Sequence, residues 1–152
     1  MPTTSVGFDD HGDILGSDAL VRFGPTIDVN IGFDAAHQPG VAGRPDLPER
    51  RLLAVVDTGA MTSCIDSALA IELRLPVMDR EDISGVHGVL AANVHLAQVY
   101  LPGLNWTVYG RFHGVHLSEG GQPHSALIGR TFLQDFTMVY EGRTGSVTIS
   151  ND

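Results

Sequence analysis

The apolar run Leu52–Val56 ends abruptly at the sequence Asp57-Thr58-Gly59-Ala60. The run is too short for a typical helix and predicts a strand that is buried on both faces. Because a carboxylate is costly to remove from water, Asp57 should reach the edge of the core. Gly59 gives the backbone freedom to turn there, and the Thr58 hydroxyl can donate and accept hydrogen bonds. Asp and Gly both favour turns, so the triplet taken alone is also compatible with an ordinary turn.

The other apolar segments are short, and turn-forming residues separate them. The chain has 152 residues, enough for one domain with its own core, and contains 18 glycines and 8 prolines. Alternation of apolar and polar residues predicts a half-buried strand over residues 26–33. Similar patterns predict an alternating strand over 104–108, a hairpin over 83–101 and a closing hairpin over 136–149 around residues 142–145. We therefore expect an all-β fold with one or two short helices.

One short helix is predicted soon after the Asp57 turn. Ile65, Leu69 and Leu73 are spaced four residues apart and would form one apolar stripe. Asp66 is a suitable N-cap, and Pro76 limits how far the helix can extend. A second helical turn fits residues 131–136.

Two segments have no clear periodicity. Residues 1–22 are rich in Asp and Gly and fit either a tail or an added strand docked on a domain that spans residues 23–152. Residues 34–50 contain several glycines and prolines and predict a long, exposed and mobile loop.

Composition excludes several classes of function. The formal net charge of −9 repels phosphates, so we expect no nucleic-acid partner. Cys64 is the single cysteine, which rules out an intramolecular disulfide and suits a reducing compartment. The N-terminus has no basic and apolar stretches of the signal-peptide kind, and no apolar run is long enough to cross a bilayer. We expect a soluble, cytoplasmic protein that does not bind membranes.

Three segments together resemble the retropepsin-like aspartic proteases, a family with a single-domain, dimeric type. Leu53–Ala60 is similar to the active-site strand and loop of that family, and Ile83–Gly88 to its glycine-rich flap. Ala126–Arg130 resembles the family's second apolar strand, which ends at a glycine and is followed by an arginine and a short helix. The three segments occur in the family's order and cover about residues 26–150.

The resemblance implies a β-barrel-like domain, closed or partly open, that forms a homodimer. Single-chain pepsins carry two Asp-Thr/Ser-Gly loops, whereas this chain has one, so a second copy would supply the second Asp57. The two carboxylates would share a proton, activate a water and hydrolyse a peptide bond of a peptide or protein substrate. This mechanism requires no metal and no cofactor.

The resemblance also implies roles for the surrounding residues. Thr58 would hydrogen-bond across the dimer axis, Gly59 would present its carbonyl to the substrate backbone, and Ala60 would complete the loop. The flap over an extended peptide would consist of Gly85, Val86, His87 and Gly88. The second apolar strand and the residue after it would be Leu127, Ile128, Gly129 and Arg130.

Two residues depart from the family's pattern. Met61 follows the loop where many members carry an acidic or other polar residue, so Arg130 lacks the acidic partner it has in viral members. Asp135 and Glu141 are candidates to replace that partner. His87 at the flap tip is unusual and fits either a pH-dependent flap or a solvated side chain. These departures leave open an alternative, a catalytically weak or inactive module that dimerises or binds peptides. The unplaced N-terminal segment also allows a precursor that trims itself.

Other residues that could serve as metal ligands or nucleophiles give weaker indications of function. His113 and His116 are three residues apart in a strand-like segment, which places them on opposite faces and argues against a metal site. Cys64 lies beside a predicted core stripe, which favours a small buried thiol over a nucleophile. Ser63 and Ser125 lack the context of a serine nucleophile.

Overall fold

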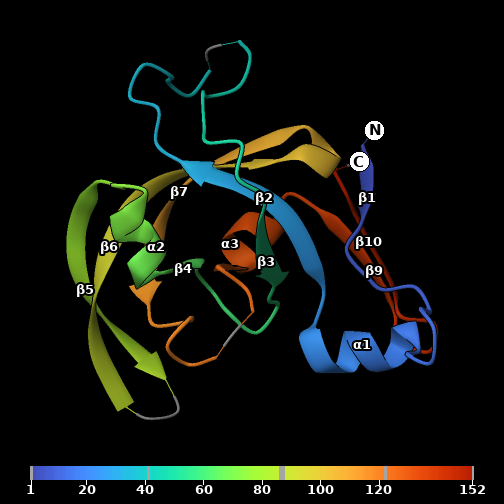
Figure 1. Cartoon of the computed structure of the whole chain (residues 1–152). Coiled ribbons are helices and arrows are strands. Elements are labelled where there is room, and N and C mark those ends of the chain that lie inside the picture. Colours follow the sequence, from blue (N-terminus) through green and yellow to red (C-terminus); the bar gives the residue numbers. More distant parts are fainter. Residues whose placement is uncertain (1, 41, 86–87, 122, 152) are drawn as a thin grey trace.

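Strands dominate the computed structural model, which describes residues 2–40, 42–85, 88–121 and 123–151 (Figure 1). The helices are short, as expected for an all-β fold. The elements in chain order are β1 Thr3–Ser5, α1 Gly16–Phe23, β2 Thr26–Gly32, β3 Leu52–Val56, β4 Cys64–Asp66, α2 Ser67–Glu72, β5 Val77–Gly85, β6 Gly88–Leu101, η1 Pro102–Leu104, β7 Trp106–Val115, β8 Ala126–Ile128, α3 Arg130–Leu133, β9 Thr137–Glu141 and β10 Ser146–Ser150.

The larger sheet places β3 beside β8. Within the described residues it has seven strands in the order β2-β3-β8-β4-β7-β6-β5. β3 and β8 run parallel, with Val56 opposite Ile128 in the register, and β2 pairs with both β3 and β6. These additional pairings curve the sheet into a partly closed barrel. The unbroken apolar runs predicted burial on both faces, but the structure buries fully only one face of these two strands: Leu53, Val55 and Leu127, on the other face, are partly exposed.

A smaller sheet stands on the other side of the molecule from the β5–β6 hairpin (Figure 1). Its order is β1-β10-β9, all antiparallel. Val6, Val147 and Ile149 from this region and Leu20 from α1 belong to the same buried cluster as the larger sheet. The first 22 residues therefore contribute one strand, most of one helix and part of the common core.

Helix α1 was not predicted from the sequence. Its N-cap residue, Leu15, makes no side-chain capping bond, so the usual sequence signal is missing. Instead Asp10 accepts a hydrogen bond from the backbone N–H of Gly16 at 2.7 Å. The helix is held by tertiary packing, because a Cβ at Gly145 would clash with the backbone of Gly16.

Two predicted boundaries were wrong. The alternating set around Trp106 is not one strand, because Leu104 lies in η1 and Asn105 then adopts a left-handed conformation with φ of 47°. Pro102 begins η1, where its missing N–H does no harm. The hairpin is longer than predicted and begins at Val77, since β5 is an edge strand whose polar and exposed residues show no alternation.

Asp66 caps helix α2, as predicted. Its carboxylate accepts hydrogen bonds from the backbone N–H groups of Leu69, Leu117 and Ser118 at 3.0–3.2 Å. Burial alone would raise the pKa of this carboxyl group, but these hydrogen bonds and one from the Ser118 hydroxyl outweigh burial and hold the pKa below its ordinary value. The predicted stripe is divided, because Ile65 belongs to β4 and not to the helix.

The loop over residues 34–50 is tied to the barrel at its start. The buried Gln98 side chain on β6 accepts a hydrogen bond from the backbone N–H of Asp34 at 2.6 Å. Its amide donates to the carbonyls of Asp34 and His37. No helix in the described residues is long and apolar enough to cross a membrane.

Candidate active site

Asp57 follows β3 directly and lies half-buried at the end of the strand. Its backbone N–H continues the pairing of β3 with β8 by donating to the Ile128 carbonyl at 2.8 Å. Its Oδ1 accepts a hydrogen bond from the Gly59 N–H at 2.9 Å, which fixes the orientation of the carboxylate within its own turn. Sequence reasoning placed Asp57 at the edge of the core, and that is where it lies.

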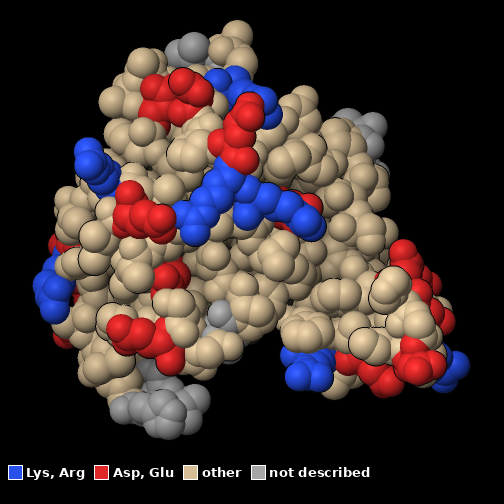
Figure 2. All heavy atoms as spheres, in the orientation of Figure 1, with Lys and Arg blue, Asp and Glu red and all other residues tan. Residues whose placement is uncertain are grey.

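The Asp57 turn opens onto a cavity of about 390 Å³. Figure 2 shows that this face of the molecule is hollowed beside the part that carries α1. The cavity is lined by the residue pairs Gly24–Pro25 and Val55–Val56, by Asp57 and Thr58, and by Met138 and Tyr140 of β9. A polar carboxylate thus faces a mostly apolar wall, an arrangement typical of ligand sites.

The residues that follow β8 hold the Asp57 loop through a hydrogen bond and close backbone packing. Gly129 is buried and donates its N–H to the Ser63 hydroxyl at 3.0 Å. A Cβ on Gly129 would lie 2.5 Å from the Thr62 carbonyl oxygen and 2.9 Å from that of Ala60. Only glycine therefore allows the two loops to approach this closely.

Helix α3 adds two more bonds to the same loop. The N–H groups of Arg130 and Thr131, at the start of the helix, donate to the carbonyls of Ala60 and Met61 at 2.8 and 3.0 Å. Helix N-termini have N–H groups without intrahelical acceptors, and here the loop satisfies them. The loop after Asp57 is consequently fixed by backbone bonds on its inner side.

Arg130 has a different partner from those considered for it in the sequence. Its guanidinium donates to the Thr58 carbonyl at 2.8 Å. Neither Asp135 nor Glu141 forms an ion pair with it in the part of the chain that the structure describes. A charged donor on a neutral carbonyl replaces the expected ion pair and holds the turn at the residue after Asp57.

Cys64 lies half-buried close to the site. Burial raises the pKa of its thiol to about 11, and the charge of Asp57 acts in the same direction. The thiol therefore stays protonated at neutral pH, which does not suit a nucleophile.

The predicted flap is only partly described. Gly85 and Gly88 face each other at the ends of β5 and β6, and Gly88 has a φ of 108°, which favours glycine. Val86 and His87 lie outside the described residues.

His113 makes contacts that the sequence did not reveal. It is 7% exposed, and its Nε2 lies 3.0 Å from Glu81 Oε2 on β5 while its Nδ1 lies 3.4 Å from the Thr62 hydroxyl. Glu81 also pairs with Arg111. These side chains line a second cavity of about 320 Å³ and connect the Asp57 loop to the arm of the β5–β6 hairpin. His116 is exposed and lies 3.4 Å from Glu119 instead.

Ser63 and His113 were missed as supporting residues. Ser63 lies 66 positions from Gly129, and Thr62 lies 51 positions from His113, so no local pattern connects them. Within the described residues, no group of three His, Cys, Asp or Glu side chains could hold a metal ion.

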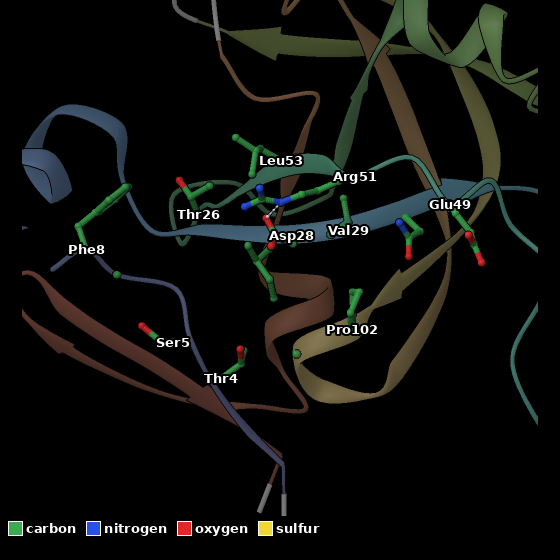
Figure 3. A pocket seen from close by; sticks show the side chains of 14 residues that line it. Thr4, Ser5, Phe8, Thr26, Asp28, Val29, Glu49, Arg51, Leu53 and Pro102 are labelled. Atoms are coloured by element: carbon green, nitrogen blue, oxygen red, sulfur yellow. Dashed lines mark ion pairs between the residues drawn. The ribbon is translucent and has the colours of Figure 1, made fainter. Parts of the chain in front are cut away.

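A wider cavity of about 540 Å³ lies between β1, β2 and η1 (Figure 3). Arg51 and Asp28, which line it, form an ion pair at 2.9 Å; the Arg51 side chain is largely exposed and that of Asp28 is about half exposed. No residue of the Asp57 loop lines this cavity, so it is separate from the candidate site.

No protein-family model and no curated protein matches the chain. It is similar to the solution structure of the simian foamy virus (mac) protease, with 16% identity, a TM-score of 0.45, and coverage of 72% of this chain and 91% of that chain. It is also similar to EIAV protease complexed with the inhibitor HBY-793, with 20% identity, a TM-score of 0.45, and coverage of 73% and 86%. Both are retroviral proteases.

Proposed function

We propose that the chain is an aspartic endopeptidase that acts as a homodimer and uses one Asp57 from each copy. The observation that carries this proposal is the fixed Asp57 carboxylate, which is held by the Gly59 N–H and faces a mostly apolar cavity. Its loop is hydrogen-bonded to the residue after β8 and to the start of α3. Such support keeps a reacting group in place. The motif resemblance supplies the type of chemistry.

The proposed mechanism requires two carboxylates that act as a pair. One carboxylate cannot act as acid and base at the same moment, and the chain has a single Asp-Thr-Gly sequence. Two carboxylates brought close together cannot both ionise readily, so they share a proton, as in the established aspartic proteases. The ionised Asp57 would take a proton from water, which attacks the peptide carbonyl. The protonated one would stabilise the oxygen charge and then assist departure of the amine.

The test is cleavage of a peptide library by the purified protein at mildly acidic pH. Asp57→Asn removes the ionisable group but keeps the shape, so it should lower kcat/KM by about a thousandfold. Asp13→Asn, at an exposed carboxylate before α1, is the matched control and should cleave like the parent. Equal cleavage by the Asp57→Asn protein would refute the assignment.

A second candidate function is peptide binding with little or no turnover. It is favoured by Met61, which is 66% exposed immediately after the loop, where a polar residue is usual in the resembled family. Peptides that bind the parent protein without being cut, and that bind the Asp57→Asn protein equally well, would support this function instead.

A further inference from the structure

His113 joins two parts of the molecule that lie far apart in the sequence. It lies on β7 and is 7% exposed. Its Nε2 lies 3.0 Å from Oε2 of Glu81 on β5, and its Nδ1 lies 3.4 Å from the Thr62 hydroxyl. Its backbone N–H also donates to the Ser63 carbonyl at 3.2 Å. The imidazole therefore stands between the β5–β6 hairpin and the chain that follows Asp57.

The part of the hairpin that extends beyond β7 is a two-stranded ribbon. β6 pairs with β7 only from Val94 onward, so residues 80–85 and 88–93 pair, among the described strands, only with each other (Figure 1). A two-stranded hairpin is at best marginally stable by itself. The position of this ribbon relative to the barrel therefore depends on side-chain contacts near its base.

Glu81 supplies such contacts. Its Oε1 accepts a hydrogen bond from Arg111 at 2.6 Å and its Oε2 lies against His113, so both carboxylate oxygens have a partner. The Arg111 side chain is 56% exposed, and exposed ion pairs contribute little to stability. The His113 side chain is 9% exposed, and a hydrogen bond to a carboxylate is stronger where water competes less. The contact with His113 should therefore dominate.

The two partners determine where the ring proton of His113 lies. A carboxylate only accepts hydrogen bonds, so the proton lies on Nε2 and is donated to Glu81. Nδ1 is then an acceptor, and the Thr62 hydroxyl can donate to it. With this tautomer each nitrogen has a partner of the right kind, and a neutral imidazole holds Glu81 and Thr62 at the same time.

We propose that His113 is a positioning residue that fixes the ribbon relative to the Asp57 loop. This inference rests on the proposed function, in which the ribbon would contact the peptide and the loop would carry the reacting carboxylate. Thr62 lies in that loop, directly after Met61, whose carbonyl accepts a hydrogen bond from α3. The loop is thus the fixed end of the link, and the ribbon is the end that moves when the link is lost. Loss of the link should weaken substrate binding and leave the chemical step nearly unchanged.

The first test is the cleavage kinetics of Glu81→Ala in the full chain. Because the link would position the ribbon and not the reacting carboxylate, KM should rise about tenfold while kcat changes by less than about twofold. Glu81→Gln keeps an acceptor for the Nε2 proton and should return KM to within about threefold of the parent value. Asp82→Ala, at an exposed carboxylate on the same strand, is the matched control and should cleave like the parent. A Glu81→Ala protein with an unchanged KM would overturn the proposal.

The second test asks whether Glu81 acts through His113 or through Arg111. His113→Phe keeps a ring but removes both nitrogens, so it should raise KM about as much as Glu81→Ala. The double variant should be no worse than either single variant, because both changes break the same link. Arg111→Met should raise KM by less than about twofold. Single effects that multiply in the double variant would overturn the role of His113. If circular dichroism shows that His113→Phe does not fold, Thr62→Val, which removes only the hydroxyl, takes its place in the same comparison.

Amide hydrogen exchange gives a measurement that does not require catalysis. The hydrogen-bonded amides of residues 88–93 should exchange at least about tenfold faster in Glu81→Ala than in Asp82→Ala, because the ribbon loses its contact with the barrel. Faster exchange without Asp57-dependent cleavage would support the link and reject the protease. Asp57-dependent cleavage with KM and exchange unchanged in Glu81→Ala would keep the protease and reject the link.

Discussion

The ends of β3 and β8 are neighbours that are built alike but place different residues in the turn that follows. Both strands are apolar, run parallel with Val56 opposite Ile128, and stop at a turn. After β3 the chain places the Asp57 carboxylate at the mouth of a cavity. After β8 it places Gly129 beneath the first turn, where no side chain fits. The comparison teaches that one strand end supplies the candidate catalytic carboxylate and the other supplies the backbone support beneath it.

The difference is clearest at the two glycines. A Cβ on Gly59 would have one close neighbour, Oδ1 of Asp57 at 3.1 Å. A Cβ on Gly129 would meet the backbone of Thr62 and Ala60 at 2.5–2.9 Å. A side-chain oxygen can move away, whereas backbone held by hydrogen bonds cannot.

Gly129→Ala is expected to have the largest effect on stability. The φ of Gly129 is −93°, so alanine brings no backbone strain and the effect is steric. Forcing the two loops apart should cost about 3 kcal/mol, the upper range for overpacking. The free energy of unfolding in urea, measured by circular dichroism, is the appropriate test.

Gly59→Ala provides the contrast. Its new methyl group would displace the Asp57 carboxylate and leave the packing of the two loops intact, so stability should change by less than about 1 kcal/mol. Peptide cleavage, if the proposed function holds, should fall sharply. Equal losses of stability in the two variants would remove the distinction between the reactive and the supporting turn.

The strand ends could be predicted because their signals are local. The apolar run before Asp57 marks a strand, although one fully buried on one face only, and the second run before Gly129 marks its neighbour. Asp66 was recognised as a cap because its position before an apolar stripe is itself the signal. The alternation in β2 and in the closing hairpin was read in the same way.

The connections between these elements could not be predicted. The bond from Arg130 to the Thr58 carbonyl spans 72 positions, and that from Gly129 to Ser63 spans 66. Such contacts depend on the register of parallel β3 and β8, which no sequence pattern encodes. Helix α1 was missed for a related reason, since packing against Gly145 holds it in place of a capping signal.

Ser63→Ala should have an intermediate effect on the supporting turn. Ser63 is 6% exposed, and its loss would leave the buried Gly129 N–H without its acceptor. The expected destabilisation is about 1–2 kcal/mol, measured by urea unfolding. Ser84→Ala, on exposed β5, is the control and should leave stability unchanged. A Ser63→Ala protein as stable as this control would mean that the Gly129 bond does not support the loop.

The smallest expected effect is on the pH dependence of stability and concerns His124, two residues before β8. His124 is 5% exposed, and its Nε2 lies 2.8 Å from the Thr26 hydroxyl, whereas its Nδ1 has no partner among the described residues. Burial lowers the pKa of His124, so the folded protein binds this proton less readily than the unfolded chain. The associated stability is fully present above the ordinary imidazole pKa of about 6.5 and is lost as the pH falls below it.

The free energy of unfolding should therefore decrease between about pH 7 and pH 5, and His124→Gln should flatten this slope. The lowered pKa of Asp66 also makes the free energy of unfolding decrease as the pH falls. This decrease occurs at lower pH, because it follows protonation of a carboxylate. An unaltered slope in His124→Gln would assign the acid sensitivity to such carboxylates. The approach to β8 would then carry no titrating group that matters, and the stability of the support beneath Asp57 at mildly acidic pH would depend on those carboxylates instead.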